Sequence, residues 1–307
     1  MEWFLSRKRM LMLGLIGVGL AAMFLLAGGY SPLKWSEDSH THQEFKTIQD
    51  QITSDPFNPS LLLKGARKSY HLARQSFRAR GSTVSDTVLK TGLRYYRRLL
   101  SKENWHLKPK DYFYAGYLYH KLGPHYIDRA RELALEAYNR DYRSRELTTL
   151  LAVVQFQEAS SKEQYRVALE YFESLGSDLR DPVLLYNKAL TLNKLGRAEK
   201  ALSVLKRGQK FIKAVPNSSV LTRRYRLARA RILFDSGQVR NALEEIDRVP
   251  QDQQGPHLRT LYARCLIELD RTEKARTVLQ EIVTSPNPPE EAKTLLKNIT
   301  DQQKARS

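Results

Sequence analysis

The 307-residue chain contains a single cysteine, Cys265. An intrachain disulfide is therefore excluded, and so are the paired cysteines of common zinc sites. The chain also lacks the nucleotide signatures GxGxxG and GxxxxGK[ST], the HExxH metal motif and the GxSxG nucleophile turn. No segment alternates apolar and polar residues with a period of two, so strands are not expected. We predict an all-α non-enzyme that uses no cofactor and no metal.

Acidic residues are scarce relative to basic ones. The chain has 51 Lys and Arg against 33 Asp and Glu, a net charge of +18. Residues 61–110 contain thirteen basic and only two acidic residues. Such a cluster should attract an anionic surface, such as phospholipid headgroups, an acidic protein or nucleic acid. The basic patch that we predict comprises Lys64, Arg67, Lys68, Arg74, Arg78, Arg94, Arg97 and Arg98.

Three segments in the C-terminal half share one register of small and apolar residues. Each has an alanine that is followed twelve residues later by a second alanine, with a leucine and then a glycine or aspartate between them. Small residues at this spacing let two antiparallel helices approach closely, and glycine permits the tight turn between them. The register positions are Ala189, Leu192, Gly196, Ala201 and Leu205; Ala230, Leu233, Gly237, Ala242 and Ile246; and Ala263, Leu266, Asp270, Ala275 and Leu279.

This pattern resembles the tetratricopeptide repeat (TPR) family, whose unit is about 34 residues long. In the best-preserved unit Leu195-Gly196 matches the family's turn and Ala201 its small residue in the second helix, whereas Leu192 stands where a Tyr is usual. Two further units, 114–134 with a longer turn and 152–172, are similar to it. The resemblance implies a right-handed α-solenoid of about five to six helical hairpins that binds other proteins or peptides.

The repeats define most of the predicted domain organisation. We expect a divergent basic helical hairpin at 58–108 and TPR-like repeats at 109–285. After the proline-rich segment that follows Ser285, residues 286–307 should form a polar capping helix and tail, with Glu290 and Glu291 in the first turn of the helix. A solenoid needs such a polar helix to cover its terminal apolar face.

The N-terminal part begins with an apolar run that follows three basic residues at 7–9. Residues 10–30 are long enough to cross a bilayer as one helix. We predict a cytoplasmic tail at 1–9, a transmembrane signal anchor at 10–30 and a polar tether at 31–57, with the repeats on the extracytoplasmic side, such as a bacterial periplasm. A signal peptide that is cleaved after Gly29 is the alternative interpretation.

The resemblance also implies which residues face a partner. In the family, the first helix of each hairpin lines a concave groove. The positions that correspond to groove residues mix arginines with aromatics, which suit carboxylates and rigid apolar contacts. We therefore expect an acidic protein segment as ligand. The predicted groove residues are Lys110, Phe113, Tyr117, His120, Tyr186, Asn193, Arg224, Arg231 and Arg264.

Three hypotheses for the function remain at this point. The first is a membrane-anchored scaffold that binds partner proteins on the extracytoplasmic face and helps to organise an envelope complex. The second is a basic surface that binds anionic polymers or lipids, for which nucleic acid is the least expected ligand because no RRM or KH pattern is present. The third is an accessory subunit of an envelope enzyme.

Overall fold

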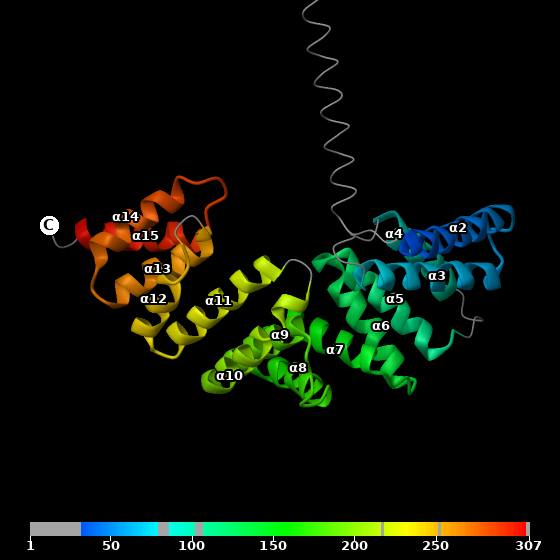
Figure 1. The fold of residues 1–307 in the computed structure, drawn as a ribbon, viewed down its shortest axis with the longest axis horizontal. Coiled ribbons are helices and arrows are strands. Elements are labelled where there is room, and N and C mark those ends of the chain that lie inside the picture. The colour runs from blue at the N-terminus through cyan, green and yellow to red at the C-terminus, as the bar shows by residue number, and fades with distance from the viewer. Residues whose placement is uncertain (1–31, 79–85, 102–106, 216–217, 251–252, 305–307) are drawn as a thin grey trace, which may run out of the picture. The chain divides into compact units, whose positions relative to one another are not determined.

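The computed structural model describes residues 32–78, 86–101, 107–215, 218–250 and 253–304 (Figure 1). All the regular elements in these ranges are helices. Two compact units divide the chain. The first contains α2 (Pro32–Ser54) and most of α3 (Pro59–Arg78) and α4 (Asp86–Leu100), and the second contains α5 to α15. The expected tail at 1–9 and transmembrane anchor at 10–30 lie outside the described residues.

The first unit packs three helices around Gly65 in α3. A Cβ atom at this position would lie 2.9 Å from Ile52 Cδ1 of α2 and 2.9 Å from Tyr95 Cε2 of α4. The predicted tether at 31–57 is therefore wrong, because most of it is α2. Phe45, Ile48 and Ile52 recur at helical spacing and are at most 5% exposed, so they bury one face of an otherwise polar helix.

The second unit is a series of helical hairpins, as the sequence predicts. Neighbouring helices pair in chain order, and each hairpin packs against the next. The hairpins are α5 (Pro109–Leu122) with α6 (Ile127–Asn139), α7 (Arg145–Glu158) with α8 (Lys162–Ser174), α9 (Pro182–Lys194) with α10 (Ala198–Gln209), α11 (Ser218–Asp235) with α12 (Val239–Asp247), and α13 (Pro256–Glu268) with α14 (Thr272–Val283). Short 3₁₀ turns η1 (Pro124–Tyr126) and η2 (Ile212–Ala214) follow α5 and α10.

The repeat register corresponds to one backbone motif at three hairpin turns. Gly196, Gly237 and Asp270 have φ angles of 75°, 78° and 58°, the left-handed conformation that ends a helix. The next amide donates a hydrogen bond to the carbonyl of the register leucine: Arg197 to Leu192 at 2.9 Å, Gln238 to Leu233 at 2.9 Å and Arg271 to Leu266 at 2.8 Å. This is the Schellman arrangement, so the aligned positions share a structural role.

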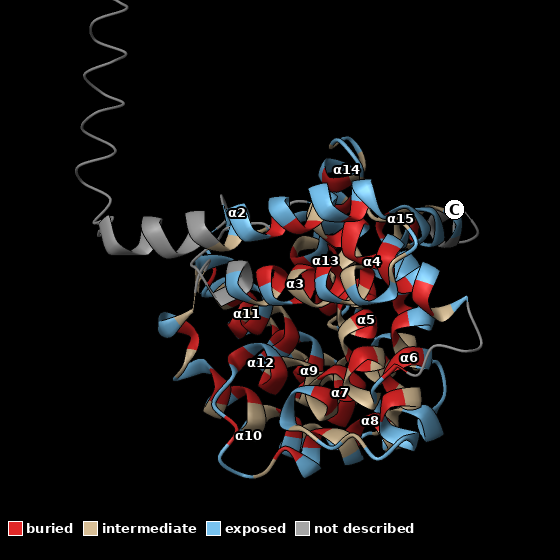
Figure 2. Cartoon of the chain, turned by 90° about the vertical axis from the view of Figure 1, so that its right-hand side faces the viewer, coloured by how far each residue is buried: buried red, intermediate tan, exposed pale blue. Residues whose placement is uncertain are grey.

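The alanines of the register form the seams between paired helices. All six are completely buried, and Figure 2 shows buried residues on the inner sides of the helices and exposed residues on the outer sides. Helix starts are fixed by side-chain caps. Asp181 accepts from the amides of Val183 and Leu184 at 2.8 and 3.1 Å, and Ser144 accepts from Leu147 at 3.1 Å. The caps explain why helices begin at these positions.

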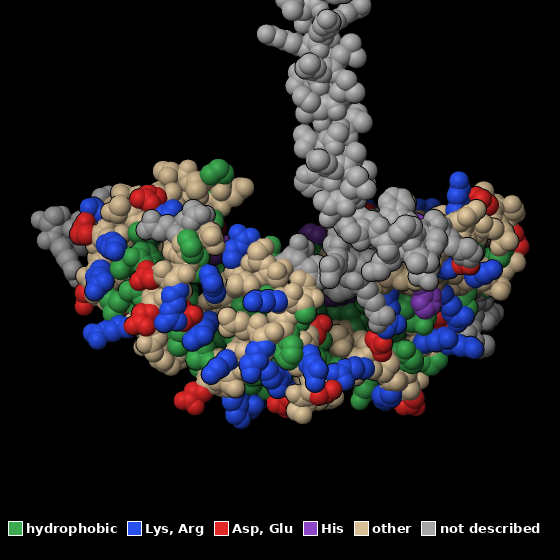
Figure 3. All heavy atoms as spheres, viewed as in Figure 1, with side chains coloured by type: hydrophobic (Ala, Val, Ile, Leu, Met, Phe, Trp, Pro, Cys, Tyr) green, Lys and Arg blue, Asp and Glu red, His purple; other side chains and the backbone are tan. Residues whose placement is uncertain are grey.

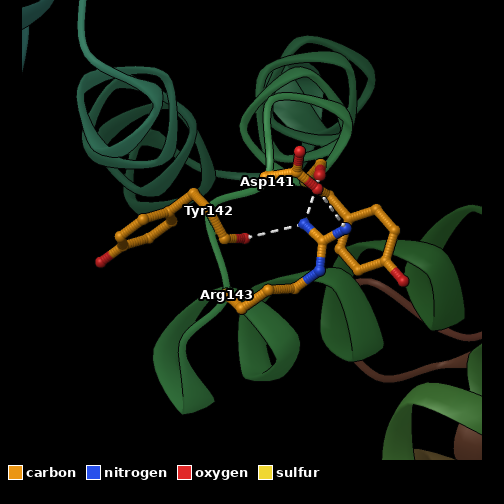
Figure 4. Close-up of polar contacts among 4 residues, drawn as sticks. Asp141, Tyr142 and Arg143 are labelled. Atoms are coloured by element: carbon orange, nitrogen blue, oxygen red, sulfur yellow. Dashed lines mark hydrogen bonds and ion pairs between the residues drawn. The ribbon is translucent and has the colours of Figure 1, made fainter.

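A polar corner joins the first hairpin to the second. Asp141, after α6, has a φ of 62°, and the Arg143 guanidinium turns back over the loop (Figure 4). Arg143 Nη1 donates to the carbonyl of Tyr142 at 3.3 Å, and Nη2 lies 3.3 Å from Asp141 Oδ1. The Arg143 guanidinium also lies 3.8 Å from the centre of the Tyr138 ring. These contacts fix the direction in which the chain enters α7.

The C-terminal helix α15 (Glu290–Lys304) covers the last hairpin. Its Ala292 and Ile299 are buried against Ala263, Leu266 and Leu279 of the α13–α14 hairpin, and the capping helix expected after Ser285 is therefore present. Among the residues that the structure describes, no helix is long and apolar enough to span a membrane.

Candidate peptide-binding surface

The first helices of the hairpins form a continuous layer. In chain order α5 contacts α7, α7 contacts α9, α9 contacts α11, and α11 contacts α13. We call the surface of these five helices the first-helix face. A segment that lies along this face would meet side chains from every hairpin, so this is the surface on which the predicted groove residues can be compared.

The α5 end of the face carries a neutral histidine beside a partly buried lysine. His120 is half-buried and its neutral form is favoured, because burial, assisted by the charge of Lys121, lowers its pKa to about 4. Burial also lowers the pKa of Lys121 to about 8, although the carboxylate of Asp181 opposes this shift. Lys121 Nζ lies 5.2 Å from the centre of the Tyr117 ring. Tyr117 and His120 are thus part of a half-buried cluster rather than an open cationic surface.

One predicted groove residue in α5 belongs to the core. Phe113 is 1% exposed, and its ring stacks on Tyr142 with 5.7 Å between centroids. The prediction that Phe113 contacts a ligand is therefore wrong, since the α6–α7 loop folds over it. Lys110, one turn earlier, is half-buried.

The centre of the face brings three predicted residues together. Arg224 and Arg231 are exposed and seven residues apart on α11, so they lie on one side of the helix about 10 Å apart along its axis. Both guanidiniums are close enough to Tyr186 of α9 to affect its ionisation: burial raises the pKa of the phenol, and the two arginines oppose that shift. Half-buried Leu190 and Leu227 add apolar surface on α9 and α11.

Two other predicted residues are already engaged by partners within the chain. Asn193 Nδ2 donates to Asp235 Oδ2 at 2.9 Å. Arg264 Nη1 lies 3.0 Å from Glu291 Oε1, and its guanidinium lies 4.3 Å from the centre of the Phe234 ring. The sequence does not predict these two pairings, because Asp235 and Glu291 are 42 and 27 residues from their partners. Arg224 and Arg231, in contrast, form no ion pair within the described residues.

The predicted basic patch lies on the first unit and is only partly open. Lys64, Arg94 and Arg97 are exposed, and Arg67 and Arg74 are half-buried. Lys68 forms an ion pair with Glu44, and Arg98 Nη1 donates to the carbonyl of Pro56 at 3.2 Å. The side chain of Arg78 lies outside the described residues. Lys64 on α3 and Arg94 on α4 are therefore the members of the patch that are exposed and for which no contact is described.

Residues suited to metal chemistry are not grouped in the described ranges. No three His, Cys, Asp or Glu side chains there could hold one ion together. Cys265 is completely buried in α13, and this burial raises the pKa of its thiol to about 11. The cysteine thus fills space in the helix seam, as expected for a small residue in mid-helix.

Comparisons with known proteins agree with this architecture. A family model described as "Anaphase-promoting complex, cyclosome, subunit 3" matches residues 216–282, and no curated protein sequence gave a significant match. A chain in the crystal structure of the APC/C hetero-tetramer Cut9–Hcn1 is similar, with a TM-score of 0.54 and 14% identity, over 84% of this chain and 46% of that one. A tetratricopeptide repeat protein from Parabacteroides merdae gives a TM-score of 0.49 at 14% identity, over 87% and 95% of the two chains. The described helices have the fold of a TPR-like helical-hairpin solenoid.

Proposed function

We propose that the protein is a TPR scaffold that binds an acidic segment of a partner protein on its first-helix face. The observation that carries this proposal is the group of Tyr186, Arg224 and Arg231. Two exposed guanidiniums flank one half-buried aromatic ring, and arginine forks pair bidentately with carboxylates. Aromatic and arginine side chains are also the residues that contribute most at protein interfaces.

The repeat architecture supports binding rather than catalysis. We propose that the chain belongs to the TPR family. The matching family model covers residues 216–282, which is less than half of the chain. That segment includes α11 with its arginine pair, and the matched model describes a subunit of a multiprotein complex. A scaffold in which one helix layer carries the ligand accounts for the absence of catalytic motifs from the sequence.

A peptide-binding experiment tests the proposal. The full chain is titrated into fluorescent libraries of random peptides rich in Asp and Glu, with Asn- and Gln-rich libraries as the neutral control. We expect salt-sensitive binding of the acidic library that Arg224→Glu/Arg231→Glu abolishes. The matched control is Arg197→Glu/Arg240→Glu, which reverses the same charge at two exposed positions, one at the start of α10 and one in α12. Equal losses in both variants would reject the first-helix face.

The location of the scaffold is a separate part of the proposal. The uncharged run at 10–30, which follows basic residues 7–9, supports an anchor that displays the repeats on the extracytoplasmic side, where they would help to organise an envelope complex. Anchoring also raises the effective concentration near membrane-bound partners. Digestion by an added protease tests this topology. We expect the repeats to be digested when the protease reaches the extracytoplasmic side of the membrane. Repeats that are digested only when the protease also enters the cytoplasm would contradict the prediction.

The basic patch favours a second candidate function on the first unit. Exposed Lys64 and Arg94 would hold α3 and α4 against anionic lipid, at about 1 kcal/mol per well-placed basic residue. Flotation with anionic and neutral vesicles measures this. We expect salt-sensitive binding to anionic vesicles by protein that lacks residues 1–35, and an equal response to neutral vesicles would reject it.

A further inference from the structure

A small cavity lies between the third and fourth hairpins, away from the first-helix face. Its volume is about 190 Å³, and residues of α10, α11 and α12 line it. Four cationic side chains reach its wall: Lys206 from α10, Arg226 and Arg229 from α11, and Arg248 from α12. Lys and Arg side chains are visible over α10 and α12 in Figure 3, with Asp and Glu among them. The cavity thus gathers cations from three helices at one point.

A buried carboxylate orients two of the arginines. The Glu245 side chain is 10% exposed, and its Oε2 lies 3.4 Å from Arg229 Nε. Its Oε1 accepts a hydrogen bond from Arg248 Nη1. Arg229 uses Nε in this contact, so both of its Nη groups keep their donors for another acceptor. Guanidiniums that are already oriented lose less conformational freedom when they bind an anion.

The charge and size of the cavity define the ligand class. Four cations face one carboxylate, so the wall carries three more positive than negative groups. An excess of this size favours a dianion over a single carboxylate. The volume is below the roughly 300 Å³ at which pockets for drug-sized ligands begin, and it has room for one phosphoryl group. We propose that this cavity binds a phosphate monoester dianion or free phosphate, held by Arg226, Arg229, Arg248 and Lys206.

This site is distinct from the peptide-binding surface. Arg226 and Arg229 are two and five residues beyond Arg224, which places them roughly 200° and 140° around α11 from it. They therefore lie on the opposite side of the helix. The inference goes beyond the proposed function, and either one can fail without the other.

Titration of the full chain with inorganic phosphate tests the proposal, with saturable binding measured by calorimetry. We expect binding in the millimolar range or tighter, and a loss of at least about tenfold in Arg226→Gln and in Arg229→Gln. Arg197→Gln is the matched control, because it removes the same charge from an exposed position that is neither in the cavity wall nor on the first-helix face. Circular dichroism of each variant verifies that it has folded.

A second titration identifies the source of the phosphoryl group. A phosphoserine peptide is compared with the same peptide without phosphate. Tighter binding of the phosphopeptide than of inorganic phosphate supports a phosphorylated protein as ligand, and equal binding supports free phosphate. The proposal is overturned if neither probe binds saturably, if Arg197→Gln weakens binding as much as Arg229→Gln, or if the unphosphorylated peptide binds equally well.

Discussion

The Tyr225 hydroxyl occupies the space that a side chain at Gly208 would need. A Cβ at Gly208 would lie 2.1 Å from Tyr225 Oη, and that hydroxyl donates a 2.6 Å hydrogen bond to the carbonyl of Pro182. The contact joins α11 to the start of α9 across the end of α10. It holds the two helices that carry Arg224, Arg231 and Tyr186 in one arrangement, so it links packing to the candidate site.

Substitution of Gly208 should therefore destabilise the repeat domain. In Gly208→Ala the new methyl group displaces the tyrosine, and overpacking of this kind costs about 1–3 kcal/mol. Tyr225→Phe removes only the hydrogen bond to Pro182, which costs about 1 kcal/mol. Urea unfolding of the two single variants measures both losses.

The double variant Gly208→Ala/Tyr225→Phe tests whether the clash with the tyrosine hydroxyl causes the loss of stability in Gly208→Ala. With Phe at position 225, the nearest remaining atom of that ring lies 3.0 Å from the Cβ at 208 instead of 2.1 Å. Gly208→Ala should then lower the free energy of unfolding by less in the Tyr225→Phe background than in the wild type. Additive losses would show that the hydroxyl does not cause the effect.

Asp270 stands where the two preceding repeats have glycine, and it adopts the same left-handed conformation. Its φ of 58° disfavours a residue with a Cβ, although Asp tolerates this region better than most. Asp270→Gly should raise the free energy of unfolding by up to about 1 kcal/mol, and Gly196→Ala should lower it by about 1 kcal/mol. Thermal denaturation measures both changes.

The effect at these turns should come from the backbone alone. A Cβ at Gly196 meets no atom within 4 Å, so no clash contributes. Gly237, with a φ of 78° and open space around it, supplies a second test of the same cause. If Gly237→Ala is not destabilising, the left-handed conformation does not explain the loss in Gly196→Ala.

His120 should make the stability of the repeat domain depend on pH. Burial, assisted by the charge of Lys121, lowers the pKa of His120 to about 4 in the folded protein, from an ordinary value of 6.5. The unfolded chain therefore binds a proton that the folded chain does not between these values. Stability is fully present above pH 6.5 and falls as the pH decreases toward 4, by up to about 1.4 kcal/mol per pH unit.

Unfolding at several pH values measures this contribution. His120→Gln keeps a polar side chain near Gln157 of α7, the hydrogen-bond partner of the histidine, and should flatten the profile between pH 6.5 and 4. His125→Gln, at an exposed position in the turn after α5, should retain the wild-type profile. A wild-type profile in both variants would assign the pH dependence to other groups.

Cys265 should be unreactive until the protein unfolds. The thiol is completely buried, and burial raises its pKa to about 11, so little thiolate is available at neutral pH. Labelling by a thiol reagent should therefore proceed at the rate of opening, and it should accelerate in Gly208→Ala. Labelling in the native state at the rate of a free thiol would contradict the position of α13.

The repeat register predicted local structure well because its residues act within one hairpin. Ala189 and Ala201 are buried where two helices cross, and the leucine four residues before each left-handed turn accepts the same hydrogen bond. These features depend on side-chain size and backbone conformation over about twenty residues. The spacing of residues in the sequence is therefore enough to predict these features.

The remaining features depend on contacts between distant residues. The polar composition of 31–57 predicts a tether instead of α2, because Phe45, Ile48 and Ile52 are isolated among polar residues and are buried only through packing in the first unit. Asn193 and Arg264 are engaged by Asp235 and Glu291, which are 42 and 27 residues away in the chain, so their spacing in the sequence does not reveal the contacts. The cavity at Glu245 likewise needs three helices to be brought together.

Site-specific photocrosslinking tests the central claim most directly. A benzophenone amino acid replaces Tyr186 on the first-helix face in the full chain, and replaces Tyr165 on second helix α8 as the matched control. We predict that position 186 crosslinks to a defined partner protein through an acidic segment, that position 165 does not, and that Arg224→Glu/Arg231→Glu abolishes the product. The same partner crosslinked from position 165 alone, or a product at 186 that survives the charge reversal, would contradict binding at the first-helix face.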